Sequence, residues 1–188
     1  MTKYNKKIIV FAALAVFLVS LILLLLVIGP EEIVNKIGVR NGYIIIFIVS
    51  LFGGFSAGGS ISFITLLITF TAGGLNPVAL GLISGTSLAI GDMVMFYAGS
   101  KGRELIRGKW DKKIDKVANV FNKKKWLKKL APFLAYLYMG FAPLPNDVLL
   151  LFLAAIKFPA KKMNVIIILG DLTFALTLTL LVARGFIL

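Results

Sequence analysis

Three aspartates stand inside apolar stretches of the sequence. Asp92 and Asp171 each follow a glycine, and Asp147 follows the segment Pro143-Leu144-Pro145-Asn146. A carboxylate at the centre of a membrane costs roughly 2.5–3.5 kcal/mol, so such residues usually face a cavity or a partner. Carboxylates in this position can bind a cation, relay protons or pair with a basic residue. A carboxylate near the membrane interface can instead serve as a cap or a salt-bridge partner, and this alternative is strongest for Asp92, nine residues before Lys101.

The other candidate binding groups lie at two breaks in the apolar runs and beside one span. At the first break they are the backbone amides and hydroxyls of Gly58, Gly59, Ser60 and Ser62. At the second break they are Asn146 and the backbone groups left without helical partners by Pro143 and Pro145. Beside the span they are the basic side chains of Lys101 and Arg103. Amides and hydroxyls at the start of a helix favour an anion such as phosphate, although glycine and serine also permit close packing. Lys101 and Arg103 can hold a lipid phosphate, or only anchor the span.

The composition excludes most soluble and catalytic classes of protein. Of 188 residues, 59% are hydrophobic and 15% are charged, against about 25% charged in a soluble domain. The chain has no Cys and no His, so it lacks the commonest nucleophile, general base and metal ligand. We expect an all-α integral membrane protein that is not an enzyme and has no cofactor or metal site.

The basic residues are grouped between the apolar runs. Lys3 to Lys7, Lys101 to Lys129 and Lys157 to Lys162 hold most of the 21 Lys and Arg, against 8 Asp and Glu in the whole chain. This distribution follows the positive-inside rule for cytoplasmic loops and argues against nucleic-acid binding, the usual interpretation of a strongly basic chain. It predicts a cytoplasmic N-terminus and an external C-terminus. The expected location is the plasma membrane of a prokaryote, since the Lys- and Ile-rich composition is compatible with an archaeon or a low-GC bacterium.

The chain is expected to divide into an N-terminal transmembrane helix with an external polar link and a second, larger region. Residues 1–41 form the first part, with the span at 8–29, and residues 42–188 form the second. The second region comprises a re-entrant hairpin at 42–72, a transmembrane helix at 78–99, a basic amphipathic cytoplasmic segment at 100–129, a second re-entrant hairpin at 130–156 and a transmembrane helix at 163–187.

Length is the argument for the hairpins. Residues 42–72 carry no charge but are too long for one span and too short for two, since a span needs about 20 residues. Four glycines between 53 and 59 are expected to break the helix; a long, tilted, kinked helix is the alternative. Each broken segment is followed by a turn and a span with Gly-Asp, and such an inverted repeat is typical of secondary transporters.

The order of these motifs resembles the DedA family, the bacterial and archaeal branch of the VTT (SNARE-associated, TVP38-like) membrane proteins. The resemblance covers residues 42–188 and rests on Ala72-Gly73-Gly74-Leu75-Asn76-Pro77, Gly91-Asp92, Phe96-Tyr97-Ala98-Gly99-Ser100-Lys101-Gly102 and Pro143-Leu144-Pro145-Asn146-Asp147. It implies two inverted re-entrant hairpins and the movement of lipids: recycling of polyprenyl-phosphate carriers, flipping of phospholipids or scrambling. Coupling to H⁺ or Na⁺ has been proposed for some members. The acidic residue of many first hairpins and the arginines of many second hairpins are missing from 58–62 and 131–156.

Lipid translocation is therefore the leading hypothesis, with membrane lipids and anionic headgroups at the cytoplasmic face as partners. An ion-coupled exporter of a small solute is the second. The third is a scaffold that does not transport and binds partners through the basic segment, where Ile106, Trp110 and Ile114 recur at helical spacing. The sequence leaves the oligomeric state open, a homo-oligomer included.

Overall fold

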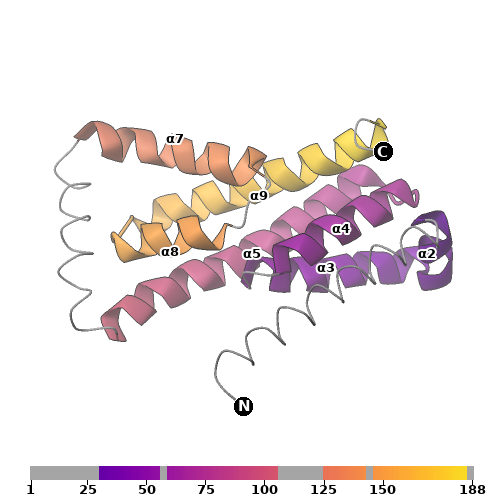
Figure 1. Cartoon of the computed structure of the whole chain (residues 1–188), viewed down its shortest axis with the longest axis horizontal. Helices are drawn as coiled ribbons and strands as arrows, with labels where there is room; N and C mark the ends of the chain where they lie inside the picture. The colour runs from indigo at the N-terminus through magenta and orange to yellow at the C-terminus, as the bar shows by residue number, and fades with distance from the viewer. Residues whose placement is uncertain (1–29, 56–58, 106–124, 143–145, 186–188) are drawn as a thin grey trace, which may run out of the picture.

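A computed structural model describes residues 30–55, 59–105, 125–142 and 146–185 of the chain. All regular structure in these ranges is α-helix, as the all-α expectation requires. The helices are α2 (Pro30–Ile37), α3 (Val39–Phe55), α4 (Gly59–Ala72), α5 (Pro77–Leu105), α7 (Lys125–Phe141), α8 (Asp147–Ala155) and α9 (Ala160–Ala183) (Figure 1). The predicted span at 8–29 and the amphipathic residues 106–124 lie outside the described residues.

Two long helices, α5 and α9, pack against each other along the centre of the bundle (Figure 1). They are antiparallel, because Gly85 of α5 lies against Leu172 and Tyr97 near the end of α5 is hydrogen-bonded to Asn164 near the start of α9. Among the described residues, these two helices are long and apolar enough to cross a membrane. Both were predicted as spans, although α5 continues to Leu105, beyond the expected end at residue 99.

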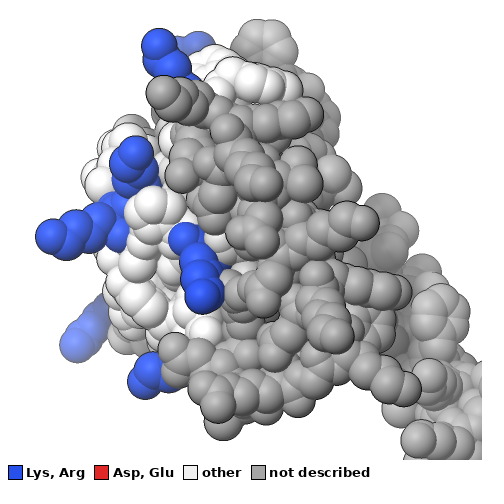
Figure 2. All heavy atoms as spheres, turned by 90° about the vertical axis from the view of Figure 1, so that its left-hand side faces the viewer, with Lys and Arg blue, Asp and Glu red and all other residues white. Residues whose placement is uncertain are grey.

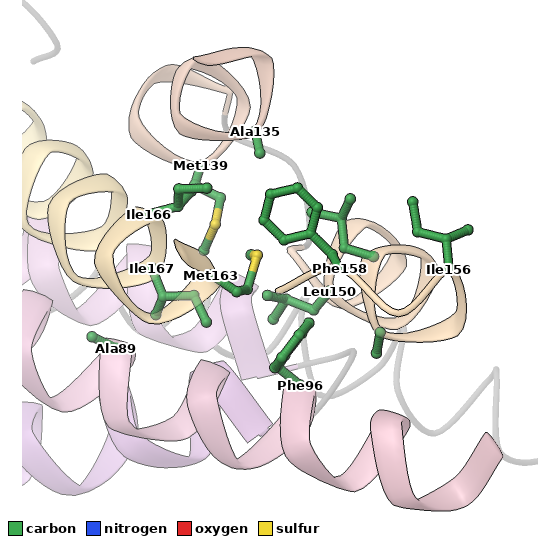
Figure 3. Packing of buried hydrophobic residues seen from close by; sticks show 12 residues of the cluster. Ala89, Phe96, Ala135, Met139, Leu150, Ile156, Phe158, Met163, Ile166 and Ile167 are labelled. Atoms are coloured by element: carbon green, nitrogen blue, oxygen red, sulfur yellow. The ribbon is translucent and has the colours of Figure 1, made fainter. Parts of the chain in front are cut away.

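Two pairs of shorter helices flank this centre, and their contacts with the long helices correspond. In the first pair, α3 packs on α5 and α4 packs on α9; in the second pair, α7 packs on α9 and α8 packs on α5. The helices α3 and α4 also pack on each other, whereas α7 and α8 hardly touch. Figure 3 shows part of the second pair, where Met139 of α7, Leu150 of α8 and Phe96 of α5 meet Met163 of α9. The helix order of residues 39–105 thus recurs in residues 125–183, with the two long helices exchanging partners.

The turns that end α4 and α8 have the same hydrogen-bond pattern. The N–H groups of Gly74 and Leu75 donate to Thr71 and Phe70, and those of Lys157 and Phe158 donate to Ala154 and Leu153. This is the Schellman motif, which needs a residue in the left-handed conformation after the helix. Gly74 takes it with φ 89°, whereas a lysine, Lys157, takes it with φ 58°. A long helix begins within three residues of each turn.

Close contacts between glycines recur in the two halves. Gly54 in the last turn of α3 lies against Gly91, and Gly140 in the last turns of α7 lies against Gly170. In both places the glycine on the long helix precedes an aspartate, Asp92 or Asp171. These contacts allow the shorter helices to approach the central helices at the level of the carboxylates.

The structure changes two predicted boundaries and confirms one predicted break. The polar link at 30–41 is mostly helical, because Pro30 occupies the first position, where no N–H is needed, and Lys36 pairs with Glu32 at 2.8 Å one turn earlier. The helix predicted to break among the glycines at 53–59 ends at Phe55, and a separate helix begins at Gly59; Gly53 and Gly54 themselves still belong to α3. The ends of the 100–129 segment belong to α5 and α7.

Many large apolar side chains are exposed on the described surface. Val148 is 74% exposed, and Phe52, Trp126, Phe133 and Val165 are each more than half exposed. They lie on four of the helices, α3, α7, α8 and α9. A soluble monomer rarely exposes so many large apolar side chains.

Candidate functional site

The three predicted aspartates are buried, and two of them meet at the centre of the bundle. Asp92 on α5 is 1% exposed, Asp171 on α9 is 0% exposed, and Asp147 at the start of α8 is 5% exposed. The Nδ2 group of Asn146 donates hydrogen bonds to Asp92 Oδ2 at 2.9 Å and to Asp171 Oδ1 at 3.3 Å. One amide therefore joins a carboxylate from each half of the molecule.

Two carboxylate oxygens at this site have no hydrogen-bond partner among the described residues. They are Asp147 Oδ2 and Asp171 Oδ2, and both are fully shielded from solvent. A buried acceptor without a partner costs about 1–3 kcal/mol. Native proteins retain such groups mainly where a ligand, a bound proton or a water molecule satisfies them.

A small cavity reaches this cluster from the side of α4. Four polar residues line it, Ser60, Asp92, Asn146 and Asp147, and the rest of its wall is apolar: Phe63, Ile64, Leu88, Met139, Ala142 and Phe174. The cavity has a volume of about 20 Å³, which is enough for about one water molecule. The cavity lies where the second helix of each pair begins, Gly59 for α4 and Asp147 for α8.

The ionisable side chains described at the site are all acidic. Within the described residues, no Lys or Arg lies within salt-bridge distance of these carboxylates; the ion pair found there is Lys36–Glu32, on α2. The N-terminal dipole of α8 favours a negative charge on Asp147. Three buried carboxylates without a cation must be balanced by protons or by a bound cation, so the site is suited to positive rather than negative groups.

The site is not arranged as a metal centre in the described part of the chain. No three carboxylates converge there closely enough to ligate one metal ion. The chemistry available is exchange of protons or of a weakly held cation, together with hydrogen bonding by Asn146 and Ser60.

The structure brings together some of the predicted residues and separates others. Ser60, Asp92, Asn146 and Asp147 share the cavity, and Asp171 reaches the cluster through Asn146. Gly59 is the first residue of α4, but Ser62 is half-buried on the same helix and does not line the cavity. Gly58, Pro143 and Pro145 lie outside the described residues.

The predicted headgroup residues lie away from the cluster. Lys101 is exposed near the end of α5. Arg103 falls in the last turn of the same helix, and its side chain lies outside the described residues. Neither forms part of the cavity wall.

Sequence reasoning missed the apolar wall and one polar contact beside the cluster. Phe63, Met139 and Phe174 close the cavity, and Tyr136 on α7 is hydrogen-bonded to Thr173, two residues after Asp171, at 3.1 Å. Helical spacing could have placed Leu88 beside Asp92, since residues four apart share a face. No local signal pairs α7 with α9.

No protein-family model, no curated protein and no solved structure matches this chain.

Proposed function

We propose that this chain is an integral membrane protein that moves lipids across the bilayer, with the polar site between the two helix pairs as the place where the headgroup crosses. The carrying observation is the cluster of buried, unpaired carboxylates at the point where two short helices begin. Polar groups within an apolar bundle are expensive and usually mark a transport path. The two span-length helices and the exposed apolar side chains support the membrane location.

The proposed topology follows from the charges at one end of the molecule. Figure 2 shows this end, where the described residues in view include exposed basic side chains and no acidic one. Exposed lysines occur near the end of α5, in α7, in the turn after α8 and at the start of α9: Lys101, Lys129, Lys157, Lys161 and Lys162. By the positive-inside rule this end faces the cytoplasm, where it meets anionic headgroups. The pairs α3/α4 and α7/α8 are then re-entrant hairpins entering from opposite sides, as in the DedA proteins that the sequence resembles.

The test is lipid movement in proteoliposomes. Fluorescent phospholipid and polyprenyl-phosphate probes should change leaflets faster than in protein-free vesicles, with and without a pH gradient. Movement of one probe that depends on the gradient indicates a coupled flippase, and movement of both probes without a gradient indicates a scramblase. Glu32→Gln is the control variant, because Glu32 is exposed, pairs with Lys36 on α2 and does not line the cavity. Absence of movement for both probes would contradict the proposal.

A second candidate function is ion-coupled export of a small solute. The observation that favours it is the acidic site without a described basic partner, whose cavity has room for about one water molecule. A lipid headgroup is larger than this space, but a proton or a small cation is not. Acidification of vesicles that accompanies solute release, without any movement of lipid probes, would favour this function over lipid translocation.

A further inference from the structure

Asn146 has an unusual place in the hydrogen bonding of the bundle. Its amide nitrogen donates to the carboxylates of Asp92 and Asp171, so both of its N–H groups are used. The two acceptors belong to α5 and α9, the central helices of the two halves. In the described structure, Asn146 is therefore a polar tie between the halves at the carboxylates, in addition to the Tyr97–Asn164 hydrogen bond at the exposed end.

The same residue immediately precedes α8. Its carbonyl accepts the N–H of Leu150 at 2.9 Å, so its position and that of the first turn of α8 are coupled. The helix has only nine residues. Its outer face is exposed at Val148 and Phe152, while its inner face lies against α5. A short helix with one packed face and one polar tie is easier to displace than a fully embedded one.

The carboxylates differ in their access to the cavity. Asp92 and Asp147 line the cavity, whereas Asp171 does not and is 0% exposed. Asn146 contacts the cavity on one side and Asp171 on the other. Access from the cavity to Asp171 therefore depends on the position of the Asn146 side chain.

We propose that Asn146 is a positioning residue that holds α8 against the two central helices, as a latch, and blocks access from the cavity to Asp171. In this proposal, transport requires α8 to move away from α5. This inference rests on the proposed function, because the movement is the step that enlarges a cavity too small for a headgroup. When α8 has moved, the side-chain amide of Asn146 no longer bonds Asp92 and Asp171, and the transport path reaches Asp171 from the side of α8.

The first test is a reversible lock between α8 and α5. A β-carbon added at Gly99 of α5 would lie 3.3 Å from the Cβ of Ala154 on α8, close to the usual spacing in a disulfide of about 3.5–4.5 Å. The nearest obstacle is the flexible end of Leu151, at 2.8 Å. The chain has no cysteine of its own, so the double variant Gly99→Cys/Ala154→Cys can form only this bond within one molecule.

We expect flux of the lipid probes to be lost on oxidation of the double variant and restored by dithiothreitol. The single variants should keep their flux under both conditions. Oxidised protein that transports as fast as reduced protein would overturn the proposal. If the wild-type chain moves no lipid at all, the proposed function fails, and the next measurement still decides on the latch.

The second test measures access to the carboxylates without any transport. A hydrophobic carbodiimide should modify Asp147, the most exposed of the three carboxylates at 5%, faster than Asp171 in the wild type, as read by mass spectrometry of peptides. In Asn146→Ala, modification of Asp171 should rise about tenfold, the effect of losing one hydrogen bond to a charged group. Asn164→Ala is the matched control, since Asn164 joins α9 to Tyr97 of α5 at the exposed end.

Either of two results would overturn the latch. One is a wild-type Asp171 that reacts as fast as Asp147. The other is an unchanged Asp171 reactivity in Asn146→Ala when circular dichroism shows the same helix content as the wild type. A rise of equal size in Asn164→Ala would indicate general loosening and would count against a role specific to Asn146.

Discussion

The first helix pair, α3/α4, and the second pair, α7/α8, have the same order and corresponding contacts with the long helices, but only α3 and α4 pack on each other. In the first pair, α4 buries Phe63, Leu67 and Phe70 almost completely, and α3 lies backbone to backbone on α5 at Gly54. In the second pair, the nine-residue α8 keeps an exposed outer face and is tied at its start by Asn146. Apolar packing holds both pairs, with Leu150 and Leu153 of α8 buried, and the hydrogen bonds of Asn146 to buried acids are added only in the second. The weaker contact between α7 and α8 is the difference that the proposed movement of α8 depends on.

The largest expected effect is on lipid flux, and it comes from the polar residues that differ between the start of α4 and the start of α8. Asp147→Asn should lower lipid flux about a hundredfold, because it removes a charge from the start of α8 while keeping its shape. Ser60→Ala at the equivalent place on α4 should keep most of the flux. Initial rates in proteoliposomes with matched protein content measure both. Equal flux in Asp147→Asn and the wild type would remove Asp147 from the site.

The glycine contacts of the two pairs should respond differently to a methyl group. In Gly54→Ala, at the place in α3 that corresponds to Gly140 in α7, the new carbon would lie 2.5 Å from the carbonyl oxygen of Leu88 and 2.7 Å from the backbone nitrogen of Asp92. We expect a loss of about 1–3 kcal/mol of stability. In Gly140→Ala the nearest atom is the Cγ2 of Thr173 at 3.4 Å, an ordinary contact, and the loss should stay below about 0.5 kcal/mol. Unfolding in detergent micelles checks the difference, and equal losses would contradict it.

The turns after α4 and α8 allow a reciprocal exchange. Lys157→Gly should raise stability by about 1 kcal/mol, because glycine adopts a positive φ without steric cost. Gly74→Lys should lower it by a similar amount, since Gly74 has φ 89°. A methyl group meets nothing within 4 Å at Gly74, so the backbone alone decides the result. The melting temperatures of the two variants should shift in opposite directions; shifts of the same sign would refute this account.

The smallest effect concerns the starts of the two long helices. Asn76 Oδ1 accepts the N–H groups of Val78 and Ala79, each at 3.0 Å, and so caps α5. Pro159 precedes α9 and makes no side-chain cap. Asn76→Ala should therefore cost about 1 kcal/mol, and Pro159→Ala less than half of that. Thermal unfolding monitored by circular dichroism can rank the two; a larger cost at Pro159 would reverse the comparison.

Much of the organisation could be predicted from the sequence, because it depends on local physics. The uncharged runs predicted the helices, including two that are long and apolar enough to cross a membrane, and Gly73-Gly74-Leu75-Asn76-Pro77 predicted the turn before α5. The aspartates were predicted as candidate sites because a charge in an apolar run is costly wherever the run folds. The glycines at 53–59 predicted a break between two helices but not its exact place: Gly53 and Gly54 remain in α3, where Gly54 packs against the backbone of α5.

What only the tertiary structure decided is which of these residues meet. Asn146 lies 54 residues from Asp92 and 25 from Asp171, and no periodicity relates positions so far apart. The exchange of partners between the halves, α4 on α9 and α8 on α5, also depends on long-range packing. The local sequence predicts that a buried carboxylate needs a partner. Which residue becomes that partner depends on which helix surfaces fit together, and this is a property of the whole bundle.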